Sequence, residues 1–181
     1  MNGKTPGFNV IGQLAALRRY ALSLVRNPDE AEDLVHDALV KAYERQSSFR
    51  TGANVRNWLM SILHNAHIDR LRQRRSLERR HDAAADLAER AMPANQDHSV
   101  RLTQLRDAFF GLPEDQRAAL HLVAIEELSY QEAADTLKIP VGTLMSRVAR
   151  ARERLRTFEQ SGPSATVTHL KIVGGTGDDK Q

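Results

Sequence analysis

Apolar side chains recur every three or four residues in three segments of the first half of the chain, and this spacing predicts three amphipathic α-helices. The predicted helices cover residues 10–25, 28–45 and 55–75. Pro28 and the acidic residues after it are typical of a helix start, and the polar residues 46–54 are predicted to form a loop. The apolar faces could bury one common core, made of Leu14, Leu17, Ala21, Leu24, Ala31, Leu34, Val35, Ala38, Leu39, Ala42, Val55, Trp58, Leu59, Ile62, Leu63 and Ala66.

A second set of helices is predicted in the second half of the chain. Its first helix has three apolar residues, Leu102, Leu105 and Phe109. A Gly-Leu-Pro sequence at residues 111–113 interrupts this helix, because proline cannot continue it, and helical spacing resumes over residues 114–125. A helix-turn-helix pattern follows at residues 128–156.

The sequence therefore predicts an all-α protein with two small helical domains. A three-to-four-helix domain is expected at residues 10–75 and a helix-turn-helix domain at residues 100–158. The flexible linker between them, residues 76–99, lacks periodicity, although its alanines permit a short helix at residues 83–92. Fully extended, this linker could reach on the order of 80 Å. Residues 159–181 are predicted to form a disordered tail.

The helix-turn-helix pattern is the most informative part of the chain. Ser129 and Glu132 match a capping box at the start of its first helix, and Pro140 prevents that helix from continuing. The second helix has a buried stripe of Leu144, Val148, Ala151 and Leu155, and on the other side Ser146, Arg147, Arg150 and Arg154, with Thr143 near its first turn. This pattern favours a helix that enters the major groove of DNA. The alternative interpretation is a surface helix with a solvated basic face.

The predicted helix at residues 55–75 also has a polar stripe opposite its apolar face. The stripe consists of Ser61, Asn65, Asp69 and Arg72, at spacings of four, four and three. An asparagine amide can pair with a base edge, and an arginine fork can bind guanine or a phosphate. The alternative is a solvated face in which Asp69 pairs with Arg72 or Gln73. The basic residues 70–80 favour nucleic acid.

Charge distribution and composition indicate which kinds of partner the chain binds and in which compartment it acts. Residues 29–44 are acidic, which suits a protein partner, whereas residues 70–80 and 147–156 are rich in arginine, which suits a polyanion. The chain has no cysteine, which excludes disulfides and fits a reducing cytosol. No apolar run has the length of a membrane span. We expect a cytoplasmic protein.

Candidate catalytic and metal-binding patterns are weak. His64 and His67 share a helix face, but Asp69 lies well round the helix from them, so no metal site is predicted. The sequence contains no nucleophile elbow, phosphate-binding loop or dinucleotide-binding loop. We therefore expect no catalytic residues, no cofactor, no metal and no small-molecule substrate.

Three segments resemble bacterial RNA polymerase sigma factors of the extracytoplasmic-function group, within the sigma-70 family. They are AEDLVHDALVKAYE (31–44), NVRNWLMSILHNAHIDRLRQRR (54–75) and GLPEDQRAALHLVAIEELSYQEAADTLKIPVGTLMSRVARARERL (111–155). The resemblance covers residues 10–158, in order and with the expected linker. It implies two helical domains that bind core RNA polymerase and promoter DNA, and control by an anti-sigma factor. It implies initiation of transcription rather than catalysis.

The resemblance also implies roles for named residues. The second helix would bind polymerase through Asp33, His36 and Asp37. The loop 46–54 and the helix after it would recognise and open the −10 element, through Ser61, Asn65, Asp69 and Arg72. The helix-turn-helix would recognise the −35 element through Thr143, Ser146, Arg147 and Arg150.

The chain departs from the family pattern at three positions. The family usually has Gln where His36 stands and Gly where Lys138 stands, and it commonly has a basic residue where Met145 stands. These departures put in doubt one polymerase contact, the shape of the turn and the −35 preference. Two other classes remain open: a free-standing helix-turn-helix regulator, and a sigma-mimicking decoy that only titrates an anti-sigma protein.

Overall fold

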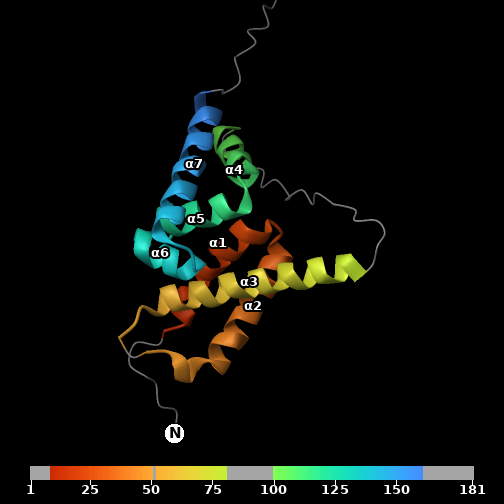
Figure 1. Ribbon diagram of the computed structural model, residues 1–181, viewed down its shortest axis with the longest axis vertical. Helices are drawn as coiled ribbons and strands as arrows, with labels where there is room; N and C mark the ends of the chain where they lie inside the picture. The colour runs from red at the N-terminus through yellow and green to blue at the C-terminus, as the bar shows by residue number, and fades with distance from the viewer. Residues whose placement is uncertain (1–8, 51, 81–99, 161–181) are drawn as a thin grey trace, which may run out of the picture.

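The computed structural model describes residues 9–50, 52–80 and 100–160, and these residues form helices without any β-strand. In chain order the elements are η1 (Ile11–Gln13), α1 (Leu14–Val25), α2 (Pro28–Glu44), η2 (Gln46–Ser48), α3 (Val55–Arg80), α4 (Val100–Gly111), α5 (Glu114–Ala124), α6 (Tyr130–Leu137) and α7 (Val141–Gln160), where η is a 3-10 turn. The predicted all-α fold is confirmed. Figure 1 shows α3 crossing the middle of the molecule, with α2 on one side and α5 and α6 on the other.

Helices α1, α2 and α3 form the N-terminal bundle, in which α2 packs against both α1 and α3. The break between α1 and α2 is local in origin. The Asn27 side chain accepts hydrogen bonds from the backbone N–H groups of Asp29 and Glu30, and Pro28 occupies the first helical position. The predicted apolar faces then meet in a core whose largest fully buried members include Leu17, Leu34, Leu59 and Leu63.

Helices α4 to α7 form the C-terminal bundle, with α5 and α6 packed against α7 and α4 beside it. The capping box at the start of α6 is present: the Ser129 hydroxyl accepts from the Glu132 N–H at 3.2 Å, and the Glu132 carboxylate accepts from the Ser129 N–H at 2.9 Å. The stripe on α7 is buried at Leu144, Val148 and Ala151. The predicted helix-turn-helix is therefore confirmed.

The two bundles lie against each other (Figure 1). Helix α5 contacts α1, and α6 contacts the first turns of α3, so that the turn of the helix-turn-helix faces the N-terminal bundle. The sequence does not predict this packing, because helical periodicity does not show which faces of two bundles will meet. Buried apolar residues of both bundles form one continuous core cluster. Buried polar side chains add specific contacts between the bundles.

The structure extends two of the predicted helices. Helix α3 continues to Arg80 rather than ending at Arg75, and α7 continues to Gln160, two residues into the predicted tail. Leu102 and Leu105 on α4 are each 49% exposed, because α4 contacts the bundle mainly along α7. The predicted short helix at 83–92 and the tail from residue 161 onward lie outside the described residues.

Lys138 ends α6 in the left-handed region, with φ of 54° and ψ of 46°. This conformation lets the N–H groups of Lys138 and Ile139 bond to the last carbonyls of α6, including that of Ala134. A side chain with a Cβ atom is strained there by roughly 1–2 kcal/mol, whereas glycine is not.

We therefore expect Lys138→Gly to raise the free energy of unfolding by about 1 kcal/mol, after the entropy that glycine adds to the unfolded chain is subtracted. Urea unfolding followed by circular dichroism measures the change. Lys138→Ala is the matched control, because it removes the same exposed charge but keeps Cβ. An equal gain in both variants would assign the effect to the charge rather than to the backbone.

Candidate nucleic-acid interface

The outer face of α7 presents the residues predicted to read DNA. Ser146 and Arg150 are exposed, and Thr143 is partly exposed one turn before them. The Ser146 hydroxyl donates to the Thr143 carbonyl oxygen at 2.8 Å, so this hydroxyl lies close to its own helix. Met145, where the family pattern has a basic residue, is 52% exposed on the adjacent side of the helix.

Arg147 is tied to another helix of its own bundle. Its Nε atom lies 3.2 Å from Oδ2 of Asp115, near the start of α5. The Asp115 carboxylate therefore holds the Nε side of the Arg147 guanidinium group. The two terminal nitrogens of Arg147 stay available to a ligand.

The residues of the polar stripe on α3 have different partners in the structure. Asn65 donates from Nδ2 to the carbonyl oxygen of Ser61 at 2.5 Å. Asp69 faces α2 and pairs with Lys41, with 3.3 Å between Nζ and Oδ2, while Arg72 is 3.9 Å away. The pairing with Arg72 that was considered from sequence is thus present, but the shorter contact is made by Lys41 from another helix.

A groove of about 620 Å³ separates α3 from the C-terminal bundle. Its apolar lining comes from Ile68, Leu71, Ala118 and Leu137. Its polar lining includes three of the predicted DNA-contacting residues, Asn65, Arg72 and Arg147. Ser61, Asp69, Thr143, Ser146 and Arg150 do not line it. Residues predicted to contact two different promoter elements therefore face one shared space.

The predicted polymerase-binding residues lie on the outer side of α2. Asp33 and His36 are exposed and Asp37 is partly exposed. Arg70 from α3 donates to the Asp37 carboxylate, at 3.0 Å from Nε, and to the Asp33 carbonyl oxygen at 2.9 Å. Asp37 is thus anchored to the bundle, while Asp33 and His36 are open to a partner.

Two exposed apolar side chains extend this surface of α2. Val40 is 45% exposed and Tyr43 is 79% exposed, at helical spacing from His36 and Asp37. Sequence reasoning missed both. The available signal was their position just outside the predicted buried stripe of α2.

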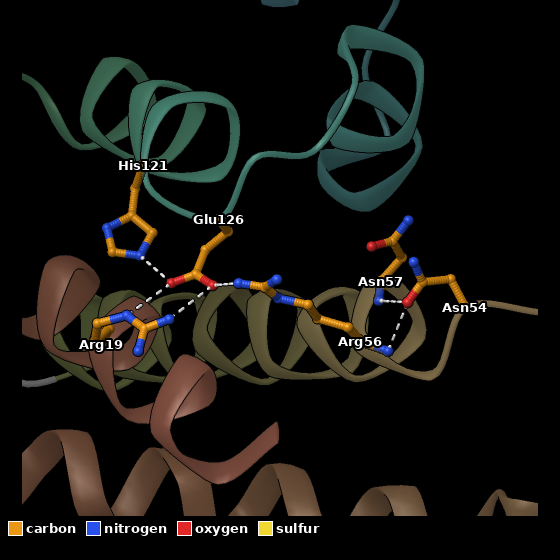
Figure 2. A network of polar contacts seen from close by, with 6 residues as sticks. All are labelled: Arg19, Asn54, Arg56, Asn57, His121 and Glu126. Atoms are coloured by element: carbon orange, nitrogen blue, oxygen red, sulfur yellow. Dashed lines mark hydrogen bonds and ion pairs between the residues drawn. The ribbon is translucent and has the colours of Figure 1, made fainter. Parts of the chain in front are cut away.

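A buried carboxylate lies at the contact between the bundles (Figure 2). Glu126, in the loop between α5 and α6, is 1% exposed. Both nitrogens of an Arg19 fork donate to it at 3.2 Å, Arg56 donates to Oε2, and His121 Nε2 lies 3.2 Å from Oε1. Burial alone would raise the pKa of Glu126, but the hydrogen bonds from His121, Arg56 and Arg19 outweigh it and lower the pKa to about 2.

A buried arginine makes a second polar contact between the bundles. Arg117 on α5 is 3% exposed, and its guanidinium donates to backbone carbonyl oxygens of both bundles. Its acceptors include Leu24 at the end of α1, at 3.2 Å, and Leu112, at 2.7 Å. The Leu24 carbonyl is among the last four of α1, which have no partner within the helix, so Arg117 satisfies the end of α1 from the other bundle. Burial, followed by the nearby Arg26, lowers the pKa of Arg117 to about 10.

Histidines and a tyrosine complete the contact. The hydroxyl of Tyr20, a fully buried residue, lies 3.0 Å from His64 Nδ1, and the Tyr20 ring lies 5.3 Å from the His121 ring. His67 Nε2 lies 2.8 Å from the Glu114 carboxylate of α5, and this hydrogen bond lowers the pKa of Glu114. His64 and His67 therefore have protein partners, and no cluster suited to a metal ion occurs in residues 9–50, 52–80 and 100–160.

Sequence reasoning missed Glu126, Arg117 and Glu114. Arg117 and His121 lie one turn apart within an otherwise apolar stretch of α5, and a charged residue at such a position is a usable signal of a buried polar contact. Glu126 gave no such signal, because it belongs to a short loop. Among the described residues, no helix is long and apolar enough to cross a membrane.

Comparison with known families accounts for both bundles. Residues 13–77 match Sigma-70 region 2, and residues 102–155 match Sigma-70 region 4. The chain is 35% identical over 175 residues to the ECF RNA polymerase sigma factor EcfG of Rhodopseudomonas palustris (strain TIE-1), covering 93% of this chain and 95% of that protein. It is 31% identical to the ECF RNA polymerase sigma factor SigW of Bacillus subtilis (strain 168), covering 74% of this chain and 77% of SigW.

Two solved structures are similar over most of the chain. One is the sigma factor RpoE in complex with the anti-sigma factor NepR from Bartonella quintana, with a TM-score of 0.72, 37% identity and coverage of 83% of this chain and 94% of that one. The other is CnrH in complex with the cytosolic domain of CnrY, with a TM-score of 0.59, 25% identity and coverage of 83% and 84%.

The buried contact should make stability depend on pH. Burial, with the neighbouring His67 second, lowers the pKa of His64 from 6.5 to about 4; Arg147 and Lys138 act in the same direction and Glu114 opposes them. The unfolded chain therefore binds a proton at His64 that the folded chain does not, and the free energy of unfolding falls as the pH drops from about 6.5 to about 4. The low pKa of Glu126 extends the loss below this range, towards pH 2.

Thermal unfolding between pH 4 and pH 7 measures this dependence. His64→Gln keeps a polar partner for Tyr20 but has no proton to take up, so its stability should change less over this range. His36→Gln, at an exposed position of α2, is the matched control and should behave like the parent chain. A His64→Gln variant that keeps the full dependence would show that other groups cause it.

Proposed function

The chain belongs to the extracytoplasmic-function group of sigma-70 RNA polymerase sigma factors. On that premise we propose which of its surfaces bind polymerase and which bind each promoter element. Residues 10–75 bind polymerase and the −10 element, residues 100–158 bind the −35 element, and residues 76–99 connect them. Polymerase makes the bonds of the transcript, so the sigma factor itself needs no catalytic residue. Because its partners are RNA polymerase and chromosomal DNA, it acts in the bacterial cytoplasm.

The outer face of α2 is the polymerase-binding surface. Its support is the combination of exposed acids and exposed apolar side chains: Asp33 and His36 at one end, and Val40 and Tyr43 at the other. Buried aromatic anchors surrounded by polar groups are typical of stable protein interfaces. The anchored carboxylate of Asp37 lies between them and loses little side-chain entropy on binding.

The −10 element is bound along α3 and the loop before it. Ser61, Asn65 and Arg72 provide hydroxyl, amide and guanidinium groups, and Phe49 packs edge-to-face on Trp58 at 5.2 Å beside the loop. Opening the duplex requires capture of unpaired bases, for which stacking and hydrogen bonds supply about 1–3 kcal/mol each. Asp69, which pairs with Lys41, contributes to base reading only if that ion pair opens.

The −35 element is bound by α7 in the major groove. Ser146 and Arg150 are already exposed there, and Arg147 is oriented by Asp115. Residues in the first turns of such a helix reach base edges, while later arginines fall on phosphates.

The observation that matters most for mechanism is that Asn65 and Arg147 line the same groove. The two promoter elements are about 25 base pairs apart, which is roughly 85 Å of DNA at ~3.4 Å per base pair. One groove cannot serve both. The packed arrangement is therefore an inactive form, and the bundles separate on polymerase.

An anti-sigma factor stabilises the packed form. The support is the similarity to RpoE, whose structure was solved with the anti-sigma factor NepR. A protein that bound both bundles at once would hold the DNA-binding residues against each other. A free-standing helix-turn-helix regulator is a poorer account, because it leaves the match of residues 13–77 to region 2 unexplained.

Run-off transcription with core polymerase tests the proposed function. The purified chain should direct initiation at defined start sites that core polymerase alone does not select. A decoy that only binds an anti-sigma protein would select none.

Locking the bundles together should abolish this activity. Asn57 Nδ2 on α3 lies 2.6 Å from Glu132 Oε1 on α6, and the chain has no native cysteine, so Asn57→Cys with Glu132→Cys can be joined by a short thiol cross-linker. We expect the cross-linked protein to lose run-off activity, and a cleavable cross-linker to restore it on reduction. The same double-cysteine protein without cross-linker is the control. Full activity of the cross-linked protein would contradict separation.

Arg147→Ala should weaken −35 binding and relax preference at one base pair by about 1–3 kcal/mol. Holoenzyme binding to a set of singly substituted −35 sequences measures this. Arg156→Ala is the matched control, because Arg156 lies at the far end of α7 and pairs with Glu153. Equal weakening on every sequence would show that Arg147 contacts only phosphate.

A further inference from the structure

The carboxylate of Glu126 occupies a site built by the other bundle. Arg19 of α1 approaches it with two parallel N–H groups, and Arg56 of α3 adds a third donor (Figure 2). The Glu126 side chain is fully buried, whereas those of Arg19 and Arg56 are 51% and 32% exposed. The acid is thus enclosed by two cations that themselves remain at the surface.

We propose that Arg19 and Arg56, with Asn57 beside them, form a site for a DNA phosphate that Glu126 fills while the bundles are packed. This proposal rests on the proposed function and adds to it a phosphate contact and the group that blocks it. An arginine fork binds a carboxylate and a phosphate with the same paired geometry. A site that holds the two oxygens of Glu126 therefore has the shape and charge needed for two phosphate oxygens.

The position of the cations suits a DNA strand that runs along α3. Asn54 begins α3 by accepting from the backbone N–H groups of Arg56, at 2.9 Å, and Asn57, at 3.3 Å, which fixes both residues at the edge of the loop 46–54 (Figure 2). Ser61, the first residue of the polar stripe, lies one turn further along. A strand bound at the stripe and the loop would pass the Arg56 guanidinium.

A second carboxylate of the C-terminal bundle covers the same region. Glu132 accepts from Asn57 at 2.6 Å. Glu126 and Glu132 both move away when the bundles separate, so one movement would uncover the two arginines and the amide together.

The energetics favour a site in which a phosphate can replace the Glu126 carboxylate over one that Glu126 fills permanently. A buried ion pair is close to energetically neutral, because desolvation offsets its Coulomb attraction. Arg56 Nε is buried and has no hydrogen-bond partner among the described residues, so Glu126 does not use the whole guanidinium. A phosphate in its place would also release counterions from the DNA.

Binding of a short, fluorescently labelled oligothymidine to the full chain, measured by anisotropy at several salt concentrations, tests the site. Glu126→Gln keeps the side-chain shape but removes the competing charge. We expect it to bind the oligothymidine about fivefold more tightly than the parent chain, the effect of one partly exposed ion pair. Its salt dependence should be steeper by ~0.7 in log K per log salt for each phosphate engaged.

Two variants decide whether the gain comes from this site. Glu127→Gln is the matched control, since it removes the same charge at the neighbouring, exposed position, and it should change binding little. Adding Arg56→Ala to Glu126→Gln should abolish the gain. The proposal would be overturned if Glu126→Gln did not raise the affinity for oligothymidine, or if Glu127→Gln raised it equally. It would also be overturned if the raised affinity persisted when Arg56→Ala was added.

Circular dichroism checks that each variant is folded. If Glu126→Gln does not fold, Glu126→Asp provides the same test, because its shorter side chain keeps the charge but withdraws it from the arginines, and it should shift binding in the same direction. Run-off transcription on the same proteins separates the two hypotheses. A parent chain that selects no start site contradicts the proposed function, whereas unchanged oligothymidine binding contradicts only the phosphate site.

Discussion

The packed form of this sigma factor depends on the burial of one carboxylate between two helical bundles. Taking a charge such as that of Glu126 out of water is costly unless cations and hydrogen-bond donors surround it. Its own bundle offers His121, and the other bundle offers Arg19 and Arg56. Because the donors come from three helices, the loop that holds Glu126 has one position in which the charge is satisfied, and this position orients α5 and α6 on α1 and α3.

The chemistry of this contact explains how the arrangement can be both specific and reversible. Apolar residues of both bundles share one core cluster, so separation of the bundles exposes some apolar surface to water. The polar contacts, such as that of Arg117 with the end of α1, can be replaced by water or by a new partner. In the proposed separation, polymerase, DNA or an anti-sigma factor would each shift the balance by binding one form better than the other.

The same packing explains why the proposed DNA-binding residues differ in their exposure. Ser146 and Arg150 on α7 face outward, while Arg147 and Asn65 face the groove between the bundles. Helix α2 lies on the side of α3 opposite α5 and α6 (Figure 1), and its Asp33 and Tyr43 are exposed. The proposed polymerase-binding surface is thus accessible while part of the proposed DNA-binding surface is covered, an order that would let polymerase engage the protein before the promoter does.

The sequence by itself determined the helices, their buried faces, the capping box at Ser129 and the helix-turn-helix, because each depends on residues within a few positions of one another. The matching motifs also sufficed to identify the family. Only the tertiary structure decided that Asp69 pairs with Lys41, that Arg70 anchors Asp37, and that Asn65 and Arg147 share a groove. Helical periodicity is a local property, whereas the contact between Arg19 and Glu126 joins residues 107 positions apart. No local spacing encodes which distant charge a buried carboxylate will meet, so that pairing follows from how the bundles pack.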